Sequence, residues 1–340
     1  MSISRITLAS ALLVPSLLQG ADHKLKAAPE TTIWGYFSAA SKPVLTVKSG
    51  DTVEIQSPWG SPELLSQAGV PPAQIQPELR LIAEKIKDRG PGPHNLTGPV
   101  AIEGAQPGDV LEVRIKDVRL DVTYAWNRFV PTGGFLPEDF PEPAVKIIPL
   151  DRKRRVGRFA PGIEIPLRPF FGTMGVAPPP SAGKISSLPP GLHGGNLDNK
   201  HLVAGTTLFL PVHTTGALFS CGDGHAAQGN GEVDITGLET SLTGVFEFIV
   251  RHDMHLKVPR AETPTHYIVM GLDPDLTAAA KMAVRESIDF LVQEKGLSRG
   301  DAYMLTSTAV DLEITQLVDG TRGVHAMIPK SLFKDAGPAR

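Results

Sequence analysis

The chain has 340 residues and a formal charge of −3 at pH 7, and 41% of its residues are hydrophobic. This length is enough for one large domain or two ordinary ones with a sizeable core. A near-neutral charge without a basic patch or stripe argues against a nucleic-acid-binding protein. The single cysteine, Cys221, excludes an intrachain disulfide, so cysteine usage does not report the compartment.

The N-terminus carries a short apolar run, residues 6–18, between Arg5 and the small residues Gly20 and Ala21. This order is typical of a secretory signal peptide. The run is too short for a comfortable membrane span, and no other stretch is apolar enough to cross a membrane. We therefore expect a leader over 1–21 and a secreted or periplasmic mature chain, 22–340, without stable membrane insertion. The alternative is a cytoplasmic protein with a short amphipathic or disordered leader.

Residues 30–270 read mainly as strands and loops. The 34 glycines and 31 prolines are spread along the chain, which favours a loop-rich β protein over disorder. Alternating or β-rich patterns predict strands at 32–37, 44–47, 52–55, 110–115, 206–212, 238–243, 245–250 and 265–271. Apolar spacing predicts short helices at 62–65 and 78–86. Residues 131–200 lack periodicity and read as a long excursion of loops with short strands at 144–148 and 168–172.

The C-terminal part begins with the clearest helix of the chain, from Asp275 to Lys295. Asp275 can cap it, and Gly296 follows its last turn. Ser298 is placed to cap a second helix that runs to about Ala309. Strands are expected at 312–318 and 324–329.

The densest group of reactive side chains is the segment 219–232. Asp223, His225, Gln228 and Glu232 lie within ten residues, and the segment contains four glycines. Glycine lets the backbone adopt positive φ, so these side chains can converge on one point. Asp, His and Glu bind divalent metals and also act as acid–base groups. The structural alternative is a polar turn in which Asp223 and His225 only cap backbone groups.

Three further positions carry candidate groups. His94 lies in a stiff loop between Pro-Gly-Pro and Gly-Pro, so its position is well defined. His193 and Asp198 flank two glycines, which alone would indicate a turn with local hydrogen bonds. Together with the segment 219–232, they become a candidate half of one site. Glu103 ends a predicted strand at Gly104.

In this order along the chain, five segments resemble the acetamidase/formamidase family: 91–99, 103–109, 193–198, 210–219 and 222–229. The resemblance covers roughly 30–330. The resemblance implies a mainly β fold with an α+β part: a β-sandwich (jelly-roll-like) body at about 30–270 and a smaller α/β part at about 271–335. It also implies hydrolysis of short amides to a carboxylate and ammonia, a divalent metal (zinc, with calcium as the alternative) and a homo-oligomer.

The resemblance extends to individual positions. The matching residues are His94, Glu103, His193, Asp198, Asp223, His225, Gln228, Glu232 and Glu239. The chain departs from the family pattern at Asn230, where an aspartate is usual, and at Cys221, where an aliphatic residue is usual.

A metal would lower the pKa of a bound water and polarise the amide carbonyl. We hypothesise that the metal ligands are His193, Asp198, Asp223 and His225. In this hypothesis Glu103 or Glu239 is the base and then the acid, while three residues orient the substrate or the ligands: His94, Gln228 and Glu232.

Two other functions are considered. The first is an amidase with Cys221 as nucleophile and His225 as its base, since a nearby base can form the thiolate. The second is a secreted β-sandwich that binds a small ligand without turnover.

Overall fold

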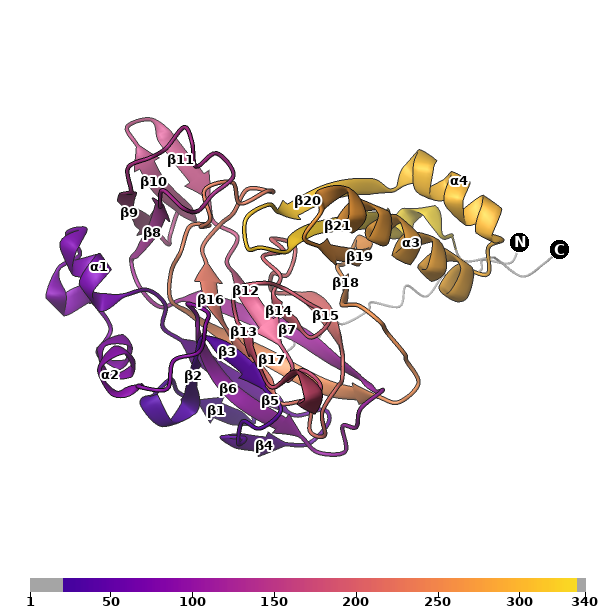
Figure 1. Cartoon of the computed structure of the whole chain (residues 1–340), viewed down its shortest axis with the longest axis horizontal. Helices are drawn as coiled ribbons and strands as arrows, with labels where there is room; N and C mark the ends of the chain where they lie inside the picture. Colours follow the sequence, from indigo (N-terminus) through magenta and orange to yellow (C-terminus); the bar gives the residue numbers. More distant parts are fainter. Residues whose placement is uncertain (1–20, 335–340) are drawn as a thin grey trace, which may run out of the picture.

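The structure, a computed structural model, describes residues 21–334 (Figure 1). Its largest element is a nine-stranded sheet with the order β1-β5-β17-β7-β15-β18-β19-β21-β20. In chain order these strands are β1 His23–Leu25, β5 Thr52–Ser57, β7 Val110–Leu120, β15 Thr206–Pro211, β17 Leu242–Arg251, β18 Arg260–Glu262, β19 His266–Asp273, β20 Asp311–Gln316 and β21 Arg322–Pro329. Along residues 21–334, no helix is both long and apolar enough to cross a bilayer.

A six-stranded sheet packs against this large sheet. Five of its strands follow the order β14-β12-β16-β6-β2, and β4 pairs with β6 in parallel. The strands are β2 Thr32–Trp34, β4 Leu45–Val47, β6 Asn95–Ile102, β12 Phe170–Gly175, β14 Gly194–Asn196 and β16 Phe219–His225.

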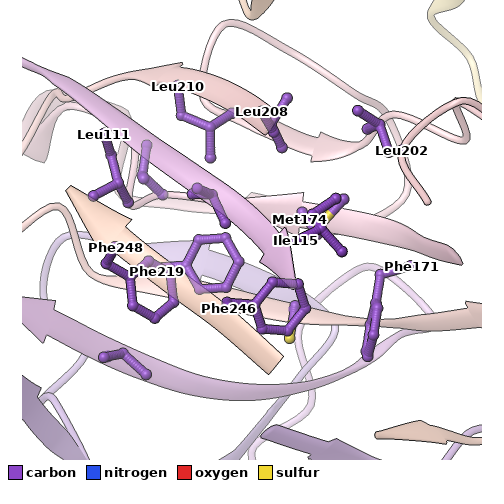
Figure 2. Close-up of a cluster of buried hydrophobic side chains, with 14 of the residues drawn as sticks. Leu111, Ile115, Phe171, Met174, Leu202, Leu208, Leu210, Phe219, Phe246 and Phe248 are labelled. Carbon is purple, nitrogen blue, oxygen red and sulfur yellow. The ribbon is translucent and has the colours of Figure 1, made fainter. Parts of the chain in front are cut away.

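The main hydrophobic core lies between the two sheets (Figure 2). Phe171 and Phe219 come from the smaller sheet, whereas Phe246 and Phe248 come from β17 of the larger one. The ring centroids of Phe171 and Phe246 are 5.3 Å apart, and those of Phe219 and Phe248 are 5.0 Å apart. All four side chains are fully buried, and each contributes about 2 kcal/mol or more through burial. The mainly β fold with sandwich packing is confirmed.

The C-terminal part extends the large sheet. The helices α3 (Leu276–Lys295) and α4 (Arg299–Ala309) cover β19 and β21, and Figure 1 shows them at one end of the molecule. As predicted, Asp275 caps α3 by accepting from the Ala278 N–H at 2.7 Å, and Gly296 ends it with a φ of 68°. The expected division near residue 271 falls inside β19, so the same sheet continues across it.

The excursion at 131–200 contains more regular structure than the sequence indicated. A four-stranded sheet, β11-β10-β9-β8, projects beside the body (Figure 1). Its strands are β8 Tyr124–Phe129, β9 Ala144–Asp151, β10 Val156–Ala160 and β11 Ile163–Pro166. The remaining elements are β3 Tyr36–Ser38 paired with β13 Lys184–Ser186, and the helices α1 Pro62–Gln67 and α2 Pro77–Lys85.

The predicted leader lies outside the described residues except for Ala21. The first described contacts belong to Asp22, whose carboxylate accepts from the Thr52 N–H at 2.9 Å and from its hydroxyl at 2.8 Å. The chain is therefore part of the fold from Asp22 onward.

Candidate active site

The site is centred on the end of β16. Asp223 and His225 lie two residues apart on this strand and therefore project from the same face. The His225 Nε2 is 3.4 Å from Asp223 Oδ1 and 3.1 Å from Glu239 Oε1. Glu239 is held beside it by an isolated antiparallel bridge between residues 225 and 239. All three side chains are buried.

Further acidic groups surround this histidine. Asp198 Oδ1 is 3.9 Å from the Nδ1 of His225, and Glu232 Oε1 is 4.0 Å from its Nε2. His94 contacts the other carboxylate oxygen of Asp223, with its Nε2 3.8 Å from Oδ2. The structure thus brings seven of the nine predicted residues into one buried group: His94, Asp198, Asp223, His225, Gln228, Glu232 and Glu239.

The backbone is unusual at three of the acidic residues. Asp198, Asp223 and Glu232 have φ values of 47°, 57° and 43°. Non-glycine residues rarely adopt this left-handed conformation, and Glu does so less readily than Asp. Such strained positions concentrate at functional sites, where the surrounding structure holds them.

Gly172 leaves room for the cluster. A Cβ atom at this position would collide with Asp198 Oδ1 and Asp223 Oδ2, and would lie 3.1 Å from His225 Cε1. The position needs no positive φ, so the requirement for glycine comes from space and not from backbone conformation. Any larger residue would displace the carboxylates.

Gln228 fixes the orientation of the central imidazole. Its amide nitrogen donates to the Asp198 backbone carbonyl at 2.8 Å, which turns its carbonyl oxygen toward His225 Nδ1 at 2.7 Å. His225 Nδ1–H therefore donates to Gln228, and Nε2 faces the carboxylates of Asp223 and Glu239. This is how a metal-binding histidine is oriented by a neighbouring residue.

The cluster carries more negative charge than its histidines can balance. Burial and the neighbouring carboxylates raise the pKa values of Asp198 and Glu232 well above their ordinary value. Burial also opposes ionisation of Asp223, but the positive charges of His225 and His94 prevail and lower its pKa to about 2. Although burial alone lowers the pKa of His225, Glu239 and Asp223 raise it well above the usual value.

These groups fit a divalent cation. Both carboxylate oxygens of Asp198 and the Oε2 of Glu232 are buried without a hydrogen-bond partner. Two sets of ligand atoms, each including His225, lie within 4.8 Å of one another: one with Asp198 and Glu232, the other with Asp223 and Glu239. Oxygen donors with one imidazole suit zinc, and the excess of carboxylates also suits calcium.

A cavity of about 180 Å³ opens onto the cluster. Its inner end is lined by Asp223, His225, Glu232 and Glu239, together with His94. Its remaining wall is largely aromatic and aliphatic. A small molecule can therefore reach these carboxylates, whereas Asp198 and Gln228 do not line the cavity.

Two predicted site residues are not in this group. Glu103 is exposed and follows the far end of β6, whereas His94 precedes the near end. Because the eight residues of β6 separate them by about 25 Å, Glu103 cannot be the base. His193 is buried, but its ring packs edge-on against Phe37 with a centroid distance of 4.9 Å. The assignments of Glu103 and His193 were therefore wrong.

A turn directly after His193 explains why this residue lies outside the cluster. Gly194 and Gly195 both have positive φ and fold the chain back, so that the His193 ring lies against Gly195. Burial lowers the pKa of His193 to about 4 and keeps it neutral. Asp198, five residues later, lies in the cluster beside His225.

Two further polar residues, Asp319 and Asn196, belong to the site and were not indicated by any sequence pattern. Asp319 lines the cavity from the turn between β20 and β21, and it accepts from the Asn196 amide at 3.0 Å. Burial raises the pKa of Asp319 to about 7. The available signal was Asp319-Gly320 directly after a predicted strand, a common turn sequence that says nothing about which site the turn reaches.

Cys221 is not part of the site. Its side chain is fully buried in the core between the sheets, and it does not line the cavity. Burial raises the pKa of its thiol, which disfavours the thiolate that a nucleophile requires. The geometry therefore argues against a Cys221 nucleophile.

A β-sandwich with a strained, buried carboxylate–histidine cluster at the end of a cavity defines the class of protein: it has the arrangement of an enzyme that works on a small molecule. The family model described as Acetamidase/Formamidase family matches residues 90–187 and 181–335. The chain belongs to the acetamidase/formamidase family.

Individual relatives agree with this membership. The chain is 31% identical to an acetamidase from Bacillus halodurans of known crystal structure, with a TM-score of 0.78 and coverage of 92% of this chain and 99% of that one. It is 25% identical to the formamidase of Methylophilus methylotrophus over 71% of this chain and 77% of that protein. It is 32% identical to the "Putative formamidase" of Schizosaccharomyces pombe over 49% of this chain, and the match spans only 56% of that relative's length.

Proposed function

We propose that this protein is a metal-dependent amidase, which hydrolyses a linear amide to a carboxylate and ammonia. The observation that carries the proposal is the buried group of Asp198, Asp223, His225, Glu232 and Glu239, with unpartnered carboxylate oxygens, at the end of a cavity. The names of the relatives, formamidase and acetamidase, give the same reaction class.

The proposed metal ligands are His225, Asp223, Asp198 and Glu232. Zinc is the proposed ion because an imidazole is among the donors. Calcium is the alternative because the other donors are all carboxylate oxygens. A divalent cation held by these residues would lower the pKa of the attacking water and polarise the amide carbonyl. Gln228 holds His225 in the tautomer whose Nε2 faces the carboxylates of Asp223 and Glu239 and would be free to bind a cation.

Glu239 is the proposed acid–base residue. Its Oε1 accepts from the Gly237 N–H at 2.7 Å, and its Oε2 accepts from the Trp59 indole N–H, so the carboxylate is fixed. Burial raises its pKa, which favours a proton on this group during turnover. Glu239 would take a proton from the attacking water and deliver it to the departing ammonia.

Asp319 and His94 complete the cavity end. Asp319, oriented by Asn196, can hold a proton near neutral pH because its pKa is raised to about 7. The Nδ1 of His94 lies 3.0 Å from the Ser187 carbonyl, which leaves its Nε2 directed at Asp223. These contacts suit residues that orient the amide and its leaving group.

The test is ammonia release from a panel of amides by the purified mature chain, before and after chelation and after addition of zinc or calcium. We expect chelator-sensitive release, restored by one of the two ions. Metal binding without release from any amide would support a ligand-binding protein without turnover instead.

We also propose export to the periplasm or the medium, and a homo-oligomer in solution. The N-terminal sequence of the mature chain tests the first proposal, which expects a start at Asp22. Light scattering coupled to size-exclusion chromatography tests the second, and a mass of one chain would contradict it.

A further inference from the structure

All three tryptophans of the chain line the cavity that ends at the carboxylate cluster: Trp34, Trp59 and Trp126. They come from three separate parts of the sequence, namely β2, the segment between β5 and α1, and β8. Aromatic side chains provide large apolar contact areas at low entropic cost. Their convergence on one cavity points to what the cavity accepts.

Two of these rings form a continuous aromatic wall with His94. The ring centroids of Trp126 and Trp59 are 6.2 Å apart, and those of Trp59 and His94 are 5.2 Å apart. The wall therefore leads to the cluster, since His94 Nε2 lies 3.8 Å from Asp223. The bond from the Trp59 indole N–H to Glu239 fixes the orientation of the central ring.

The size of the cavity exceeds what the smallest amides need. Its volume is about 180 Å³, room for about six waters at their liquid volume. Formamide has only three non-hydrogen atoms and acetamide only four. Either would leave much of the aromatic and aliphatic wall in contact with water, including Leu64, Val130 and Ile235. A ligand with a larger apolar group would cover this wall.

Arg128 adds a polar feature to the same cavity. It lies at the end of the aromatic wall, with its guanidinium carbon 5.6 Å from the centroid of the Trp126 ring. Along residues 21–334, no carboxylate forms an ion pair or hydrogen bond with this guanidinium. An unpaired, half-buried arginine in a cavity is suited to bind a carboxylate or another acceptor of a ligand.

We propose that the substrate is a primary amide of an aromatic acid, with its ring against the Trp59–Trp126 wall and an acceptor group of the ring facing Arg128. This inference rests on the proposed amidase function and specifies its substrate class. In the reaction, water adds to the amide carbonyl and the C–N bond breaks. The products are the aromatic carboxylate and ammonia, and no oxidant or reductant is needed.

The first experiment compares kcat/KM for ammonia release by the metal-loaded enzyme from formamide, acetamide, benzamide and 4-carbamoylbenzoate. We expect benzamide to exceed acetamide at least ten-fold, and 4-carbamoylbenzoate to exceed benzamide about five-fold or more. Faster turnover of acetamide than of both aromatic amides would overturn the inference while leaving the amidase function intact.

Single substitutions test which residues produce the preference for aromatic amides. Arg128→Gln should abolish the advantage of 4-carbamoylbenzoate over benzamide. The matched control is Arg152→Gln, an exposed arginine in the turn between β9 and β10 of the same small sheet; it should keep that advantage. Val130→Trp fills the cavity and should lower the ratio of benzamide to acetamide turnover at least ten-fold.

A binding measurement keeps the inference testable without turnover. Because every tryptophan lines the cavity, fluorescence excited at the indole band reports its occupancy directly. We expect benzamide and 4-carbamoylbenzoate to change this fluorescence saturably, and acetamide to do so only weakly. Aromatic binding without ammonia release would refute the amidase function alone, whereas absence of aromatic binding to an enzyme that turns over acetamide would refute the substrate class.

Discussion

Two clusters in this molecule contain the same residue types and differ in what those residues can do. In the first, His225 meets Asp223 and Glu239; in the second, Glu313 meets His201 and His325. The ligand atoms of each lie within 4.8 Å of one another. Spacing does not distinguish the two, but the first has two carboxylates with one histidine and the second has one carboxylate with two histidines.

The second cluster is a balanced network. Glu313 Oε2 lies 2.9 Å from the Nε2 of His201, accepts from the Asn230 amide at 2.5 Å, and lies 3.3 Å from the Nε2 of His325. Thr315 binds the other nitrogen of His325 at 2.6 Å. The contact with His325 first, and then the hydrogen bonds from His201 and Asn230, hold the pKa of Glu313 well below its usual value. A single carboxylate is therefore satisfied by its neighbours.

The first cluster is unbalanced and accessible. Its two carboxylates outnumber its histidine, the adjoining Asp198 and Glu232 add three oxygens that lack a hydrogen-bond partner, and a cavity reaches it. The cavity is not lined by any of the three residues of the second cluster. The comparison teaches that charge balance and access distinguish a candidate metal centre from a network that joins β20 and β21 to the rest of the fold. The predictions below test this distinction.

The largest effect is expected from His225→Ala. It removes the imidazole shared by both ligand sets, so bound metal should fall below half an ion per chain and amide turnover by about 10³-fold or more. Metal analysis and ammonia release measure the two losses. The paired variant His325→Ala alters the second cluster and should lower the melting temperature without removing the metal. An active, metal-loaded His225→Ala protein would refute the ligand assignment.

Gly172→Ala should weaken metal binding by about 10²-fold, because its Cβ would occupy the space of the Asp198 and Asp223 carboxylates. Overpacking should also cost about 1–3 kcal/mol of stability. Titration with zinc, followed by calorimetry, measures the affinity. The control is Gly300→Ala in α4, where a Cβ would meet only Ser298 Oγ at 3.9 Å. Unchanged affinity in Gly172→Ala would show that the cation lies elsewhere.

The raised pKa of Asp319 predicts that the stability of the chelated protein depends on pH. Burial raises its pKa from about 4 in the unfolded chain to about 7. Its contribution to stability is therefore fully present below pH 4 and is lost as the pH rises through 7, by on the order of 2–4 kcal/mol. Urea unfolding between pH 5 and 8 measures this loss.

The matched variant is Asp319→Asn, which cannot ionise. It should flatten the decline in stability between pH 5 and 8 and stabilise the chelated protein at the upper end. A pH dependence equal to that of the unaltered chain would exclude Asp319 as a group that titrates in this range.

The smallest effect is expected from Glu313→Gln. The amide keeps the shape of the second cluster but loses its charge, so the melting temperature should fall by about 2–4 °C. Metal content should stay the same and turnover should change less than two-fold. Loss of one bound ion per chain in this variant would make the second cluster a metal site and remove the distinction between the two.

Local patterns predicted most of the regular structure. Period-two alternation gave strands such as β5 and β7, and the capping residues Asp275 and Gly296 gave both ends of α3. The four-stranded sheet of β8–β11 was harder to predict from the sequence, because its strands are largely exposed and lack a continuous buried face. Without a clear apolar alternation, the sequence indicated only a short strand at 144–148, within β9, and the other strands of this sheet were not predicted.

The site was predictable where one strand presents it. Asp223 and His225 share a face of β16, and glycines leave space around them. The prediction of His193 as a metal ligand was wrong because two glycines with positive φ reverse the chain after it. A sequence does not show to which side such a turn directs a side chain. Asp319 and the tryptophan wall depend on contacts between distant segments, which no local pattern encodes.

The central claim is that the cluster around His225 holds a divalent cation that amide hydrolysis requires. The most direct test is metal content per chain, measured on the purified protein together with ammonia release before and after chelation. The account predicts about one ion per chain, loss of release on chelation and its return when the ion is restored. Undiminished ammonia release from a protein shown to be free of metal would contradict it.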